Sequence, residues 1–186
     1  IMKFICILIS FLLVSCASVD KTQPEVISYK DYSSQKNIND FFNLALSAKI
    51  TLFVEKKGFT GKLIWNAKNG KSSITLLNPF NSVVSKVYLN KSNNSIKISN
   101  LSTNKNEIED ILRQIFGDKQ NVFILERLIM NPPAQLTSKN NVSLFYKDWQ
   151  VDYEGVIKKE NKIFPKYIEL NKNEITLKIY IIKWES

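Results

Sequence analysis

Hydrophobic and polar residues alternate along much of the chain beyond residue 47, and this period of two predicts β-strands with one buried face. Ala48, Ile50, Leu52 and Val54 give the clearest run, because polar residues such as Lys49 separate them. The same pattern predicts strands over residues 48–55, 59–66, 73–77, 83–90, 95–100, 142–146, 149–153, 166–170 and 175–184.

Three segments show a helical period instead. Residues 108, 111, 112, 115 and 116 are all apolar and share one helix face, with Gly117 as a C-terminal stop. A second apolar stripe runs over residues 122–129 and ends at Pro132-Pro133, which cannot continue a helix. A short helix is also expected over residues 38–46, with Asn39 as its N-cap.

Many strands interrupted by a helix pair predict an α+β fold that is mostly antiparallel β, a barrel-like curved sheet that the helices plug or cover. Asn69-Gly70 predicts a tight hairpin, because both residues tolerate positive φ. We expect one folded domain over residues 38–186, a size that can bury a substantial core.

Large aromatic residues are spread over the predicted strands, and they leave two interpretations open. One is ordinary core packing, and the other is an apolar cavity for a hydrophobic ligand. The last strand places Ile175, Leu177, Ile179 and Ile181 on one face and apolar bulk on the other. The aromatic residues, two of them on that second face, are Trp65, Tyr88, Trp149, Tyr153, Tyr180 and Trp184.

Composition excludes several common classes of enzyme. The 186 residues contain no histidine, which excludes Ser-His and Cys-His catalysis, and two cysteines cannot build a zinc cage. Five glycines without a GxGxxG or GxxxxGK[ST] pattern leave no phosphate-binding loop. The net charge of +9 comes from scattered lysines, so a solvated surface and a partner-binding surface both remain open.

The pattern at the N-terminus indicates an export signal. Lys3 precedes a short apolar run, too short for the roughly 20 residues of a transmembrane helix, so residues 1–15 are expected to be a signal peptide. Leu13-Val14-Ser15-Cys16 resembles the lipobox of bacterial lipoproteins, in which the cysteine is acylated and becomes the new N-terminus. The alternative is an ordinary signal peptide with a chance cysteine.

Residues 16–37 are expected to be the lipidated Cys16 followed by a flexible polar tether. In Gram-negative sorting rules an aspartate directly after the acylated cysteine retains a lipoprotein in the inner membrane. Ala17 is not aspartate, so the resemblance implies an anchor in the outer membrane with the domain facing the periplasm. Export also disfavours a nucleic-acid partner, whatever the positive charge.

Stretches over nearly the whole chain resemble, in order, the LolB family of outer-membrane lipoproteins. The first stretches are the lipobox, the run Gly58-Phe59-Thr60-Gly61 that leads to Trp65, and residues 77–82. The expected helix over 108–117 and the second helix that ends at Pro132 follow. The last stretches are residues 148–153, Phe164-Pro165, and residues 174–179 with the closing Trp184.

The resemblance implies a half-open barrel with helices over an apolar cavity that accepts acyl chains of client lipoproteins from the periplasmic carrier LolA. It implies a monomer without cofactor, metal ion or catalytic residues, which inserts its clients into the outer membrane. The cavity residues are expected on the inward face of the sheet: Ile50, Leu52, Leu63, Trp65, Ile74, Leu76, Ile179 and Ile181.

The family also has a protruding loop that helps insertion, with the motif Asn-Pro-Leu-Gly. Here it reads Asn78-Pro79-Phe80-Asn81, so Pro79, Phe80 and Asn81 form the expected membrane-insertion loop. Phenylalanine keeps the apolar character, and asparagine still allows positive φ. Whether Phe80 protrudes or folds back onto the core is left open by the pattern.

Two other classes of function remain beside the receptor. Another periplasm-facing lipoprotein with a similar sheet could bind a different lipid or a protein partner. An enzyme would have to use carboxylates such as Glu107, Glu109 and Asp110, but these cluster at a predicted helix start, where acidic residues stabilise the helix dipole.

Overall fold

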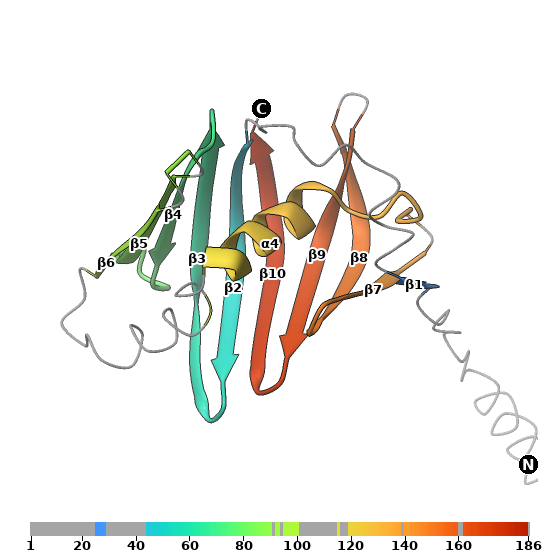
Figure 1. The fold of residues 1–186 in the computed structure, drawn as a ribbon, viewed down its shortest axis with the longest axis horizontal. Helices are drawn as coiled ribbons and strands as arrows, with labels where there is room; N and C mark the ends of the chain where they lie inside the picture. Colours follow the sequence, from blue (N-terminus) through green and yellow to red (C-terminus); the bar gives the residue numbers. More distant parts are fainter. Residues whose placement is uncertain are drawn as a thin grey trace, which may run out of the picture.

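The computed structural model describes residues 25–28, 44–90, 92–93, 95–100, 115, 119–138, 140–159 and 162–185. Within these residues, ten strands form a single sheet, and a 12-residue helix lies against it (Figure 1). The elements are β1 (Glu25–Ser28), β2 (Leu44–Val54), β3 (Lys57–Lys68), β4 (Lys71–Leu77), β5 (Val83–Asn90), β6 (Ser95–Asn100), α4 (Lys119–Met130), β7 (Val142–Tyr146), β8 (Trp149–Lys159), β9 (Lys162–Lys172) and β10 (Ile175–Glu185).

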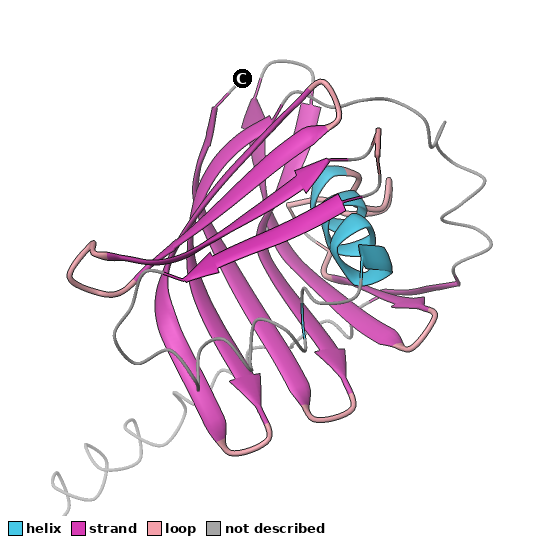
Figure 2. Cartoon of the chain, turned by 60° about the vertical axis from the view of Figure 1, so that its left-hand side comes forward, coloured by secondary structure: helices cyan, strands magenta, loops and turns pink. Residues whose placement is uncertain are grey.

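The sheet is curved and open. Its strand order is β1-β7-β8-β9-β10-β2-β3-β4-β5-β6, and every neighbouring pair is antiparallel except β1 with β7. The strands curl around α4, which lies on the concave side (Figure 2). The mostly antiparallel, unclosed sheet that we expected is therefore confirmed.

Alternating burial explains why these residues form strands. In β4, for example, Ser72, Ile74 and Leu76 are buried while Lys71, Ser73 and Thr75 between them are not, so one face of the strand meets the core. The predicted strands are found at their places, with β8 and β9 longer than expected.

The expected helix over residues 38–46 is wrong at its C-terminal end. Residues 44–46 belong to β2, where Leu46 is buried and pairs with Trp65. The reason is that the two-residue period of Ala48, Ile50 and Leu52 continues back to Leu46. The rest of that segment lies outside the described residues.

The hairpin at Asn69-Gly70 is confirmed. The two residues have φ of 51° and 73°, and they connect the paired residues Lys68 and Lys71. Positive φ at both positions gives a turn whose twist matches that of the flanking strands.

Of the expected helix pair, the second member is confirmed as α4. The Asn131 amide donates to the Arg127 carbonyl at 2.9 Å in the last turn, and Pro132-Pro133 follow. The first member, expected over residues 108–116, falls outside the described residues except for Ile115, which is helical and fully buried.

The segment expected to be a flexible tether contains strand β1. Residues 25–28 pair in parallel with residues 142–145 of β7. Cys16 and the other residues of the segment lie outside the described part of the chain. Eight residues lie between Cys16 and Glu25, so the nine Cα–Cα steps that join them span at most about 30 Å.

The last strand corrects the expected placement of Trp184. An irregularity in the register between Ile181 and Lys183 shifts the alternation by one residue, so that Trp184 pairs with Leu46 and is buried. The alternation had placed Trp184 on the outer face with Tyr180 and Ile182, which are indeed exposed. Instead Trp184 stacks on Phe164, with the ring centroids 4.4 Å apart.

Gly61 provides a stability prediction. A Cβ on Gly61 would lie 2.1 Å from the Leu77 carbonyl oxygen and 2.7 Å from the Phe59 ring, so β3 or β4 would have to move. We expect Gly61→Ala to lower the free energy of unfolding by about 2–3 kcal/mol, as overpacking does in a tight core. Chemical denaturation followed by tryptophan fluorescence measures this change.

Gly58→Ala is the matched control. Its Cβ would meet the ring of Phe53 at 3.0 Å, and that half-exposed side chain can turn away. We expect a loss below about 1 kcal/mol for this variant. Equal losses in the two variants would show that the close approach of Leu77 does not constrain β3.

Candidate functional site

The eight residues expected to line the cavity come together on the concave face. Ile50, Leu52, Leu63, Trp65, Ile74, Leu76, Ile179 and Ile181 extend from β2, β3, β4 and β10, which are neighbours in the sheet, and none is more than 2% exposed.

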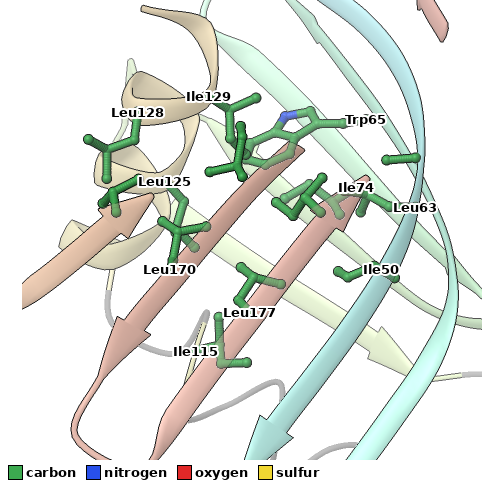
Figure 3. Packing of buried hydrophobic residues seen from close by; sticks show 14 of the residues in the cluster. Ile50, Leu63, Trp65, Ile74, Ile115, Leu125, Leu128, Ile129, Leu170 and Leu177 are labelled. Atoms are coloured by element: carbon green, nitrogen blue, oxygen red, sulfur yellow. The ribbon is translucent and has the colours of Figure 1, made fainter. Parts of the chain in front are cut away.

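Helix α4 covers this concave face. Leu125, Leu128 and Ile129 on its inner side reach toward Trp65 and toward the side chains of the sheet (Figure 3). The helix was expected, but sequence reasoning did not assign its side chains to the site. Their three- and four-residue spacing was the available signal.

Strands on the other side of β10 complete the face, and sequence reasoning did not place them there. Leu170 of β9 lies below the helix in Figure 3, and Val151, Tyr153 and Ile168 are equally buried. Their alternation along β8 and β9 predicts a buried face but does not tell which strands share it.

Two buried hydrogen bonds connect the helix to the sheet. The Ser72 hydroxyl of β4 donates to Glu126 Oε2 at 3.3 Å, and the Tyr153 hydroxyl of β8 donates to the Leu128 carbonyl at 3.0 Å. Leu125, Leu128 and Ile129 add apolar contacts between the helix and the sheet. The position of the helix therefore depends mainly on the burial of apolar surface, and this burial does not require one particular orientation of the helix.

The concave face is filled in this structure. Side chains that are 0–2% exposed have no water-sized space beside them, and this applies to all eight expected residues and to the helix residues Leu125, Leu128 and Ile129. The described residues therefore show a core in which α4 occupies the space above the sheet. An open apolar cavity stays a prediction.

Trp65 carries a buried polar atom without a partner among the described residues. Its indole Nε1 is inaccessible to solvent and donates no hydrogen bond. A buried unsatisfied donor costs about 1–3 kcal/mol. The indole Nε1 of Trp149 in the same core is also without a partner among the described residues, so Trp65 is one of at least two buried donors that an oxygen-bearing ligand could satisfy.

The turn between β4 and β5 presents Phe80 to solvent. The Asn78 side-chain oxygen accepts from the Phe80 amide at 2.9 Å and from the Ser82 amide at 3.0 Å, and the Asn81 amide donates to the Asn78 carbonyl at 2.9 Å. Asn81 takes the positive φ of 62° that asparagine tolerates. Phe80 is 87% exposed, so it does not fold back onto the core.

The outer face carries a polar network between β9 and β10. Burial raises the pKa of the Tyr167 hydroxyl above its ordinary value, and donation to Glu169 at 2.6 Å raises it further. Burial alone would also raise the pKa of Glu169. Hydrogen bonds from Tyr167 and Asn171 and the Lys178 ammonium at 3.4 Å outweigh it and hold that pKa below its usual value.

An open curved sheet with a helix on its apolar concave face defines a half-barrel protein, and one of its turns exposes a phenylalanine. The family model described as outer membrane lipoprotein LolB matches residues 42–184, which is most of the chain. The chain belongs to the LolB family, whose members are outer-membrane lipoproteins that face the periplasm, act in lipoprotein localisation and work with the carrier LolA. No curated protein matches the chain.

At 12 residues α4 is too short to cross a bilayer, and no helix elsewhere in the described ranges has the length and apolarity that a crossing needs.

Proposed function

We propose that this chain accepts the acyl chains of client lipoproteins from a LolA-like carrier on its concave face and delivers them to the outer membrane. In this proposal Cys16 carries the lipid anchor, Phe80 contacts the bilayer, and the eight concave-face residues contact the acyl chains. The molecule acts as a monomer and without covalent chemistry.

The observation that carries the proposal is the apolar side of α4, with Leu125, Leu128 and Ile129, resting on the apolar concave face of the sheet. An acyl chain that enters between them replaces one apolar contact with another, so displacement of α4 costs little net burial. Moving an acyl chain out of water is worth about 0.8 kcal/mol for each CH₂. A lipoprotein therefore crosses the aqueous periplasm only between apolar sites.

Transfer of this kind runs downhill, because the sequence contains no nucleotide-binding motif. The concave face has to bind the acyl chain slightly better than the carrier does, and the bilayer has to bind it better still. The Trp65 N–H supports the same proposal. An acyl chain that enters the concave face brings its ester carbonyl with it, and that carbonyl could accept a hydrogen bond from the Trp65 indole.

Displacement of a hydrophobic fluorophore tests acceptance. We expect a lipid-modified peptide to displace the fluorophore at concentrations at least about 1,000-fold lower than its unacylated form, because even six buried CH₂ groups contribute on the order of 5 kcal/mol. Equal competition by the two peptides would contradict acyl binding and favour a protein-binding surface.

A further inference from the structure

A shallow hollow lies on the face of the sheet opposite α4, and its lining residues come from β3, β4, β5, β6 and the turn between β3 and β4. It measures about 880 Å³ and is largely open to solvent, so a ligand there would stay partly exposed. Most of the residues that line it have polar side chains, although their carbon atoms make up most of the exposed lining surface. They are Asn66, Lys68, Asn69, Lys71, Ser72, Ser73, Tyr88, Leu89, Asn90, Ser95 and Lys97.

The strand register concentrates positive charge in this hollow. Lys68 and Lys71 are direct partners across the β3–β4 pair, and Lys97 of β6 is the partner of Tyr88 on β5. Like charges placed directly opposite each other destabilise a sheet. The lining contains no carboxylate, and within the described part of the chain these three lysines form no ion pair.

Three asparagines and an exposed aromatic ring surround the lysines. An amide side chain both donates and accepts, which suits hydroxyl groups on adjacent carbons of a sugar. Tyr88 is 43% exposed and offers an apolar ring face with a polar tip, against which the C–H face of a sugar ring can pack. Amides, an aromatic ring and lysines together match a ligand that is both polyhydroxylated and anionic.

We propose that this hollow binds an anionic saccharide, with its carboxylate or phosphate group between Lys68 and Lys71 and a sugar ring against Tyr88. The anion would relieve the repulsion between the two lysines, which explains why the hairpin tolerates that pair.

The position of the hollow favours a saccharide over the anionic headgroups of a bilayer. Lys71 begins β4, whereas Phe80 lies beyond its other end, and the seven residues of the strand extend about 20 Å. If Phe80 contacts the membrane, as the proposed function has it, the hollow is held away from the headgroups. Only this step rests on the proposed function.

Isothermal titration calorimetry of the mature protein in a neutral detergent tests the proposal, with tetragalacturonic acid as the anionic probe and maltotetraose as the neutral one. We expect binding of tetragalacturonic acid alone. The affinity should fall at least about 10-fold in Lys71→Gln and in Tyr88→Ala. Lys86→Gln is the matched control, because Lys86 lies on the same strand as Tyr88 but outside the lining.

Equal loss of affinity in Lys86→Gln would overturn the proposal, because it would show diffuse attraction to a basic surface. So would binding to phosphatidylglycerol vesicles that depends on Lys71 without any binding of the saccharide. The assay contains neither client nor carrier, so a failed saccharide site leaves lipoprotein reception untouched. A failed reception assay likewise leaves saccharide binding in place.

Discussion

Phe80→Glu is expected to reduce delivery of client lipoproteins into liposomes by roughly 10-fold or more, while acceptance from the carrier continues. Moving an exposed phenylalanine into lipid contributes about 1.5–3 kcal/mol, which corresponds to one to two factors of ten in a rate or an equilibrium. A carboxylate at that position removes this contribution and is itself rejected by lipid. The measurement is the rate at which a labelled client moves from the loaded protein into vesicles.

The fold should survive the substitution, because the turn is held by the Asn78 side chain and by backbone hydrogen bonds and not by the Phe80 ring. Phe80→Leu should deliver clients at nearly the normal rate, since apolar size is what matters.

Phe145→Glu provides a matched control for the charge. Phe145 is about half exposed, and it lies on β7 and not at a projecting turn. Delivery at the normal rate by Phe80→Glu, or an equal loss in Phe145→Glu, would assign membrane contact to another part of the molecule.

The strands could be predicted because their burial follows the backbone period. Residues such as Ile50 and Leu52 alternate with exposed side chains, and the Asn69-Gly70 turn has the backbone angles that its residues favour. The exposure of Phe80 could be predicted from the resemblance to the LolB family. Its physical cause is the Asn78 side chain, which accepts hydrogen bonds from the backbone of the turn.

Features that depend on contacts between distant segments could not be predicted in the same way. The irregularity in β10 places Trp184 inside because Leu46 and Phe164 offer it a packing site there, and neither lies near it in the sequence. Strand β1 forms because β7 presents an unpaired edge, which a reading of the polar residues around 25–28 alone does not reveal.

The same limit applies to the candidate site. The inward residues of β2, β3, β4 and β10 follow from alternation, but α4 approaches the sheet through contacts such as Ser72 with Glu126 that join residues 54 positions apart. Whether α4 stays on the concave face or moves away depends on the free energy of the contact between helix and sheet. The pattern of hydrophobic residues does not give that free energy.

Locking α4 to the sheet is expected to abolish acyl binding. The variant carries Ser72→Cys and Glu126→Cys in a chain without residues 1–16, which removes both native cysteines. These two side chains are in contact across the helix–sheet interface, so a short bifunctional thiol reagent with a reducible bridge can join them. If acyl chains enter by displacing the helix, the joined form has no space to accept them, because its concave face is filled.

A cross-link on the outer face is the control for the reagent. Thr75 and Lys86 are direct partners across β4 and β5 and point away from the helix, so Thr75→Cys with Lys86→Cys joins two strands that have no need to separate. This joined form should bind acyl chains as the unmodified chain does. The same holds for the Ser72→Cys, Glu126→Cys variant before cross-linking.

The most direct test of the account is therefore the affinity of a lipid-modified peptide for the Ser72–Glu126 cross-linked form, measured by fluorophore displacement before and after reduction of the bridge. We expect a loss of at least about 100-fold, since more than 3 kcal/mol of acyl burial becomes inaccessible, and full recovery on reduction. Unchanged affinity in the cross-linked form would contradict it, because acyl chains would then bind without moving the helix from the concave face.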